Sequence, residues 1–172
     1  MNLPDYLRSL GACPEVRKWA AGYSTLAEAW TACERADWLL WYVGKRGVDR
    51  KILVRAACAC ARTVLPYVPV GEDRPHRAIE MAERWCDGRA TLQEVGAYAA
   101  DAYAAYAAAD AAYAYAAYAA AAAAYAAAAY ADAYAADAAD AAYAAADADA
   151  RSKAHLKMCV LVRALIPCPS EP

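Results

Sequence analysis

Phenylalanine is absent from this chain, and large aliphatic side chains are scarce in it. Val, Ile, Leu and Met together supply 28 of the 172 residues, whereas alanine alone supplies 53. The 62% hydrophobic content therefore overstates the material for a core, which consists of those 28 residues with 5 Trp and 14 Tyr. A chain of this length is expected to form one domain, here with a core rich in alanine contacts.

Strand signals are also missing. The sequence has 10 Val, 3 Ile and 4 Thr, and no run in which β-branched and polar residues alternate. Because such runs are the usual mark of half-buried strands, we predict an all-α fold, a compact bundle of about six to eight helices. We expect a single domain over residues 1–172, with helices of mixed composition over 1–96, Ala/Tyr/Asp helices over 97–150 and a last helix over 151–166.

Basic residues are missing from the middle of the chain. The net charge is −2, and residues 97–150 contain 7 Asp but no Lys or Arg. Since general nucleic-acid binding depends on neutralising phosphates, this composition argues against it. No segment has the run of large apolar residues that a membrane span requires. The seven cysteines, with no signal peptide in view, predict reduced thiols in a cytoplasmic protein.

Helix boundaries can be placed from residues that favour helix ends. Pro4 and Pro14 each predict the first turn of a short helix. Asp49 is expected to cap a helix that Pro66 ends and whose apolar stripe consists of Ile52, Leu53, Ala56, Ala57, Cys60 and Val64. Pro75 is expected to open a helix that Gly88 closes. Two Thr-x-x-Glu pairs have the spacing of capping boxes, namely Thr25 with Glu28 and Thr91 with Glu94.

The strongest apolar run follows Asp37, which we expect to be an N-cap. Six apolar residues in succession over 38–43 leave no polar face, so this helix is predicted to be central and buried. The helices with the strongest apolar stripes supply four expected core residues, Trp38, Leu39, Trp41 and Trp85.

Residues 97–150 consist of 37 Ala, 10 Tyr and 7 Asp. Alanine has the highest helix propensity, but a single helix of this length would span about 80 Å, roughly twice the width of a globule of this size. The tract is therefore expected to fold back at least once. In the absence of Gly and Pro, the turns are expected at Asp110 and in the region 132–137.

The usual catalytic and metal-binding patterns are not found. The chain lacks a Gly-rich phosphate loop and a Gly-x-Ser-x-Gly motif, and its two histidines are His76 and His155. His155 and Cys159 have ligand-compatible spacing but no second pair, and Cys58 and Cys60 point in different directions on a helix. We therefore expect a protein that is not an enzyme, with no metal and no cofactor.

Tyrosines on alanine helices could line a groove for a planar ligand, with arginines meeting its phosphates. The alternative is that most of these tyrosines pack at the edge of the core. Arg62 and Arg84 are expected to be partly buried, either paired with Asp of the tract or facing a cavity. The candidate residues for a ligand or partner are Arg62, Arg74, Arg77, Arg84, Tyr103, Tyr106, Tyr113 and Tyr118.

Three segments carry a resemblance: DRPHRAIE at residues 73–80, ERWCDG at 83–88 and TLQEV at 91–95. With Arg74, Trp85 and Gly88 as their most distinctive residues, they resemble a bacterial family of immunity proteins from polymorphic toxin systems. Segments 37–43, 47–51 and 56–62 are similar to Ala/Tyr/Asp-rich phage and prophage proteins. The resemblance covers about residues 27–167. It implies an all-α fold and a toxin-neutralising or phage-accessory role, and no catalytic residues.

The sequence therefore predicts a binding protein, encoded by a phage or mobile element, that inhibits a protein effector of bacterial conflict. An acidic surface suits a basic partner, and tyrosine is enriched at interfaces. The alternative is a sponge that sequesters a nucleotide-like immune signal in a pocket of Tyr and Arg. A homo-oligomer is left open.

Overall fold

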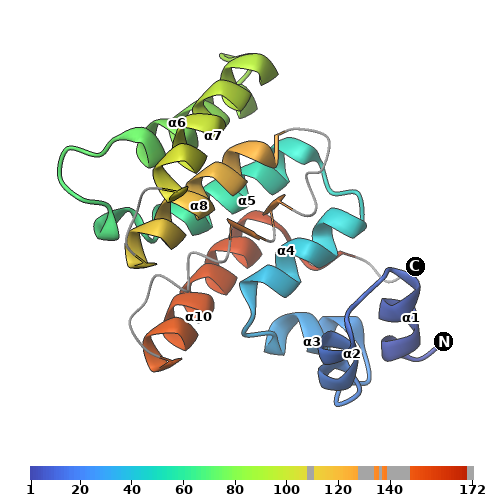
Figure 1. Ribbon diagram of the computed structural model, residues 1–172. Helices are drawn as coiled ribbons and strands as arrows, with labels where there is room; N and C mark the ends of the chain where they lie inside the picture. Colours follow the sequence, from blue (N-terminus) through green and yellow to red (C-terminus); the bar gives the residue numbers. More distant parts are fainter. Residues whose placement is uncertain (108–110, 128–133, 136, 139–147, 170–172) are drawn as a thin grey trace. The chain divides into compact units, whose positions relative to one another are not determined.

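The computed structural model describes residues 1–172 with the exception of 108–110, 128–133, 136, 139–147 and 170–172. For residues 106–107, 111–117 and 148 it describes the backbone alone. Within these described residues the chain forms nine α-helices, one short 3₁₀ helix and no strand. The all-α prediction is confirmed, with slightly more helices than expected (Figure 1).

Contacts divide the chain into two compact units, residues 1–33 with 168–172 and residues 34–167. The expectation of a single domain stays a prediction. The first unit contains three short helices, and prolines occupy the first turns of two of them, as expected. These helices are α1 (Leu3–Ser9), α2 (Pro14–Ala20) and α3 (Leu26–Ala32).

The second unit contains the larger helices. They are α4 (Ala36–Lys45), α5 (Arg50–Arg62), the 3₁₀ helix η1 (Leu65–Tyr67), α6 (Arg74–Cys86), α7 (Leu92–Ala107), α8 (Ala111–Tyr125) and α10 (Ala148–Leu165). Helices α7 and α8 pack against each other, so the alanine-rich tract does fold back. The turn expected at Asp110 lies outside the described residues, as do residues 132, 133 and 136 of the region 132–137.

Helix α8 is the central element of this unit. It lies among α5, α6, α7 and η1, each of which it contacts (Figure 1), and all six alanines over residues 119–124 are buried. A segment in which every residue is buried must be enclosed by neighbours, and methyl side chains let those neighbours approach closely. Helix α10 covers α4 and α5 from another side, burying Met158, Cys159 and Val162.

Both capping boxes are present. The Thr25 hydroxyl accepts from the backbone N–H of Glu28 at 3.2 Å, and the Glu28 carboxylate accepts from the backbone N–H of Thr25 at 3.3 Å. The Thr91 and Glu94 pair makes the same two bonds at 3.2 and 2.7 Å. Asp49 caps α5 as predicted, through the backbone N–H groups of the first turn.

The helix predicted over residues 37–43 is present as α4, and four of its six apolar residues are buried, Leu39, Leu40, Tyr42 and Val43. Helix α4 begins one residue earlier, so Asp37 lies in its first turn and pairs with Arg35 at 2.7 Å instead of capping the helix. Of the expected core residues, Leu39 is buried, whereas Trp38, Trp41 and Trp85 are only half-buried. Large indole rings at the rim of the bundle cover its edge, and the small alanines of α8 take the centre.

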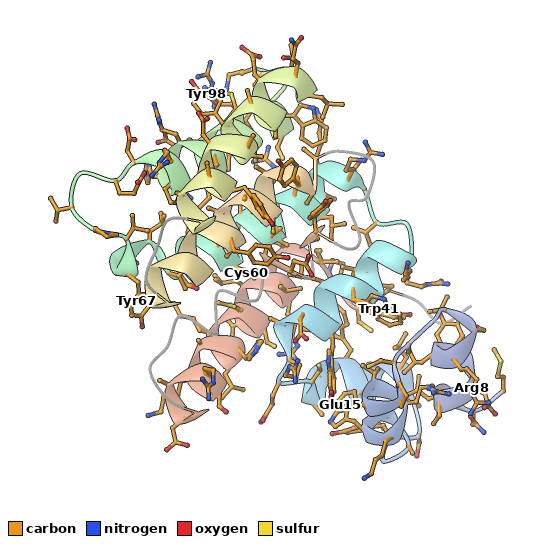
Figure 2. The ribbon with its side chains drawn as sticks, in the orientation of Figure 1. Arg8, Glu15, Trp41, Cys60, Tyr67 and Tyr98 are labelled. Carbon is orange, nitrogen blue, oxygen red and sulfur yellow. The ribbon has the colours of Figure 1, made fainter. Side chains whose placement is uncertain are left out.

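One further expectation about burial fails. Ile52 is 41% exposed, because it lies at the edge of the predicted stripe of α5. The other five residues of that stripe are buried as predicted, namely Leu53, Ala56, Ala57, Cys60 and Val64. Figure 2 shows Cys60, on the same helix, in the interior of the bundle, and Tyr67 of η1 at its edge. None of the described helices combines the length and the hydropathy needed to cross a bilayer.

Candidate functional site

Two hollows in the second unit bring candidate residues together. The first, which we call the arginine hollow, has a volume of about 510 Å³. Residues seven apart lie on one face of a helix, which places Arg55 and Arg62 side by side along α5, opposite the acidic residues of α6. The arginine hollow is lined by Arg55, Arg62, Glu80, Glu83, Arg84, Asp87, Arg89 and Leu165.

Acidic residues of α6 and its C-terminus neutralise most of the arginines. Arg62 makes a two-bond pair with Glu83, at 2.8 and 2.6 Å, and Arg55 pairs with Asp87 at 2.6 Å. Arg89 pairs with the same aspartate. Hydrogen bonds from Arg89 and Arg55 lower the pKa of Asp87, and the hydrogen bond to Glu83 raises the pKa of Arg62.

Arg84 differs from its neighbours in the arginine hollow. Among the described residues it makes no ion pair, and it is exposed. The expectation that it is partly buried is therefore wrong, because its position on α6 faces outward. Its guanidinium leaves the hollow with a surplus of positive charge, four arginines against three carboxylates.

The second hollow, which we call the tyrosine hollow, has a volume of about 450 Å³. Positions 118, 121, 122 and 125 recur at helical spacing, so one face of α8 supplies two tyrosines and a floor of two alanine methyl groups. Helix α7 adds Tyr103 from the side, and Tyr134 follows from further along the chain. The lining consists of Tyr103, Tyr118, Ala121, Ala122, Tyr125 and Tyr134.

The tyrosine rings form two tilted pairs. The ring centroids of Tyr103 and Tyr118 lie 6.5 Å apart, and those of Tyr125 and Tyr134 lie 5.3 Å apart. The Tyr118 hydroxyl donates to the Asp137 carboxylate at 2.9 Å. Burial, followed by the proximity of Tyr134 and Tyr103, raises the pKa of Tyr125, so this phenol stays neutral at physiological pH.

The predicted candidates are divided between these hollows and other places. Arg62 and Arg84 line the arginine hollow, and Tyr103 and Tyr118 line the tyrosine hollow. Arg74 pairs instead with Glu72. The side chains of Tyr106 and Tyr113 lie outside the described residues.

Arg77 contacts the tract away from both hollows. Its guanidinium lies 5.8 Å from the ring centroid of Tyr98, and it pairs with Asp73 at 3.4 Å. Tyr98 is near the end of the bundle in Figure 2.

One of the two surroundings expected for Arg62 was an ion pair with an Asp of the tract. The structure gives it Glu83, because α5 packs directly on α6.

The site prediction missed two of the four arginines that line the first hollow and two of the four tyrosines that line the second. The seven-residue spacing between Arg55 and Arg62, and between Tyr118 and Tyr125, was available as a signal. Nothing in the sequence pointed to Arg89 or Tyr134, since each reaches its hollow from outside the helix that supplies most of the lining. No residue lines both hollows, and no group of three or more metal-ligating side chains gathers within the described residues.

The comparisons with known proteins add no relative to these findings. The chain matches no family model, and no curated protein or solved structure is significantly similar to it.

Proposed function

We propose that this protein is a non-enzymatic binding protein that inhibits a protein effector of bacterial conflict, as an immunity or anti-defence protein does. The observation that carries the proposal is the separation of the two hollows. A nucleotide sponge needs arginines and tyrosines converging on one ligand, whereas the lining residues here fall into one arginine set and one tyrosine set.

The charge of the tract supports a basic protein partner. Asp is the only charged residue type over residues 97–150. Asp101 is exposed on α7, two residues before Tyr103, which is 47% exposed. Partly exposed tyrosines and exposed carboxylates on the same tract supply both contact area and electrostatic steering towards a positively charged surface. The resemblance to immunity proteins favours a toxin or defence effector as that partner.

A sponge remains the second candidate because of one feature. Arg84 adds an unneutralised guanidinium to a hollow that three further arginines line. An anionic ligand such as a cyclic nucleotide or an ADP-ribose could displace the carboxylates there and take bidentate hydrogen bonds.

One experiment separates the two candidates. The protein is co-expressed with a panel of basic growth-arresting effectors, and each pair is tested for restored growth and for a purified complex. We expect one pair to give both. Calorimetry of the purified protein against cyclic and ADP-ribose-type nucleotides is the second arm. Micromolar or tighter binding, lost in a folded Arg62→Ala or Arg84→Ala variant, would contradict the proposal and favour the sponge.

A further inference from the structure

We propose that the arginine hollow receives one carboxylate of the protein partner, the side chain of an aspartate or a glutamate. This inference rests on the proposed function and names a group that the partner presents. Helix α5 contributes Arg55 and Arg62 to the hollow, and α6 and the turn after it contribute Arg84 and Arg89. Guanidinium groups recognise carboxylates through charge-assisted hydrogen bonds, which are often bidentate.

Arg84 is the guanidinium with which the entering carboxylate pairs. It is exposed and makes no ion pair within the described part of the chain, whereas the other three arginines of the hollow each pair with a carboxylate. Hydrogen bonds from Thr91 and, less strongly, the charge of Arg84 lower the pKa of Glu94 on α7. Thr91 holds that carboxylate at the start of α7, so the N–H donors of Arg84 stay available to a partner.

The paired arginines of the hollow keep further donors. A guanidinium has N–H groups on three nitrogens. Arg55 and Arg89 each use one terminal nitrogen on Asp87. Arg62 uses Nε and one terminal nitrogen on Glu83. An entering carboxylate can therefore accept hydrogen bonds from these arginines without breaking a pair that the folded chain already makes.

The net charge of the hollow selects a monoanion. Its four arginines face three carboxylates, those of Glu80, Glu83 and Asp87, so one further negative charge restores neutrality. A phosphate dianion would exceed that balance beside the fixed carboxylates. No aromatic side chain is among the lining residues, so a nucleobase would find no ring on which to stack. The carboxylate of an aspartate or a glutamate satisfies both conditions.

The source of the carboxylate is a protein surface because the hollow is open to solvent. The side chains of Arg89 and Glu80 are 67% and 52% exposed, and exposed ion pairs hold a free ion only weakly. A side chain on a docked partner is brought there by the rest of the interface, and complementary charge then fixes the register of the complex. Leu165 is exposed at the hollow and offers an apolar contact for the methylene groups of that side chain.

The test uses matched capped tripeptides with the full-length protein at low salt. Gly-Glu-Gly is compared with Gly-Gln-Gly, and Gly-Asp-Gly with Gly-Asn-Gly, which have nearly the same shapes without the charge. Binding is followed through the NMR signals of ¹⁵N-labelled arginine side chains, which detect weak complexes. We expect the charged peptide of each pair to bind about three- to tenfold more tightly than its neutral partner, and added salt to reduce this preference.

The variants locate the binding. Arg84→Gln should remove most of the preference for charge. Glu80→Gln should increase it about twofold or more, because it removes a negative charge whose ion pair in the described part of the chain is with His76 at 3.6 Å. Arg77→Gln is the matched control, since it removes the same charge from an exposed position of α6 outside the hollow.

Four results would overturn the inference. They are equal affinity within each peptide pair, no binding, a preference for charge that persists in folded Arg84→Gln, and tighter binding of capped Gly-phosphoserine-Gly than of Gly-Glu-Gly.

The outcome also distinguishes this inference from the proposed function. If the glutamate peptide binds at Arg84 but no effector forms a complex, the carboxylate site stands and the inhibitor role fails. If an effector complex forms and Arg84→Gln weakens it no more than Arg77→Gln does, the inhibitor role stands and the carboxylate site fails.

Discussion

Burial controls the chemistry of the titratable side chains in the core of the second unit. His155 of α10 is buried, and burial is the main cause that lowers its pKa from 6.5, with Asp37 acting in the opposite direction and Arg35 in the same direction. Burial also raises the pKa of Cys58 and Cys60, and it raises that of Cys86 to about 11. Each group is therefore held in its neutral form.

Stability should fall as the pH drops below about 6.5. Above that pH the His155 ring is neutral in both states. Below it the unfolded chain takes up a proton that the folded state resists, so acid favours unfolding until the folded pKa is passed. We expect His155→Gln to reduce this loss between about pH 7.5 and 5, because the variant side chain takes up no proton in either state. Urea titrations at a series of pH values measure it, and an unchanged slope would contradict the account.

Cysteine reactivity should follow burial. Cys13 is exposed, whereas Cys86 is buried with a pKa near 11, raised from 9.0. The thiolate is the reactive form, so at pH 8 Cys86 should have about a hundredth of the thiolate of an unshifted thiol. We expect a thiol reagent to modify Cys13 at least that much faster in the native protein. After denaturation without reductant, the count should approach seven, and a count of five or fewer would indicate disulfides.

Alanine dominates at the scale of the helices. Ala99, Ala102 and Ala105 of α7 are buried at a three-residue spacing, and α8 is buried over the whole of residues 119–124. A methyl group fills little volume, so helix backbones come close and leave little room for a larger side chain. The packing of α8 against its neighbours thus depends on its buried positions having side chains no larger than alanine.

Adding bulk to α8 should therefore destabilise the protein. Ala123 is fully buried, whereas Ala100 of α7 is exposed. We expect Ala123→Leu to cost about 1–3 kcal/mol or more, as overpacking does, and Ala100→Leu to change stability by less than about 0.5 kcal/mol. Denaturant titrations of the two variants measure the difference. Equal effects would mean that the α8 position is open to solvent.

The sequence predicted most helix ends but not which helix is central. Capping residues and prolines act locally, so Thr25, Asp49, Pro75 and Thr91 marked helix starts correctly. Burial depends on tertiary contacts, which hydrophobicity alone does not predict. The indoles of Trp38 and Trp41 were expected in the core and are only half-buried, whereas the expected abundance of alanine in the core is found in α7 and α8.

The candidate site was predictable only in part, for a similar reason. Residue types were identified correctly, since Arg62, Arg84, Tyr103 and Tyr118 all line hollows. Their grouping was not, because it depends on which helices pack together. Helix α6 supplies carboxylates to the arginines of α5, and this pairing keeps the arginines of the first hollow apart from the tyrosines of the second.

At the scale of the whole molecule, the second unit is organised around the alanine-rich tract. Helices α5, α6 and α7 each contact α8, and α10 contacts α5. The proposed binding surface exists only if α7 and α8 are stably folded, because the tyrosine hollow takes its lining from both. The account therefore depends on an ordered tract of Ala, Tyr and Asp.

Hydrogen–deuterium exchange of the backbone amides of α8 tests this most directly. A helix enclosed by α5, α6 and α7 can exchange only when the unit opens. We predict that amides over residues 119–125 exchange about 10³-fold or more slowly than unprotected amides, and that they are among the slowest in the chain. Exchange of this segment at the rate of an unstructured peptide would contradict the account, because it would leave the tyrosines without the helix that assembles them.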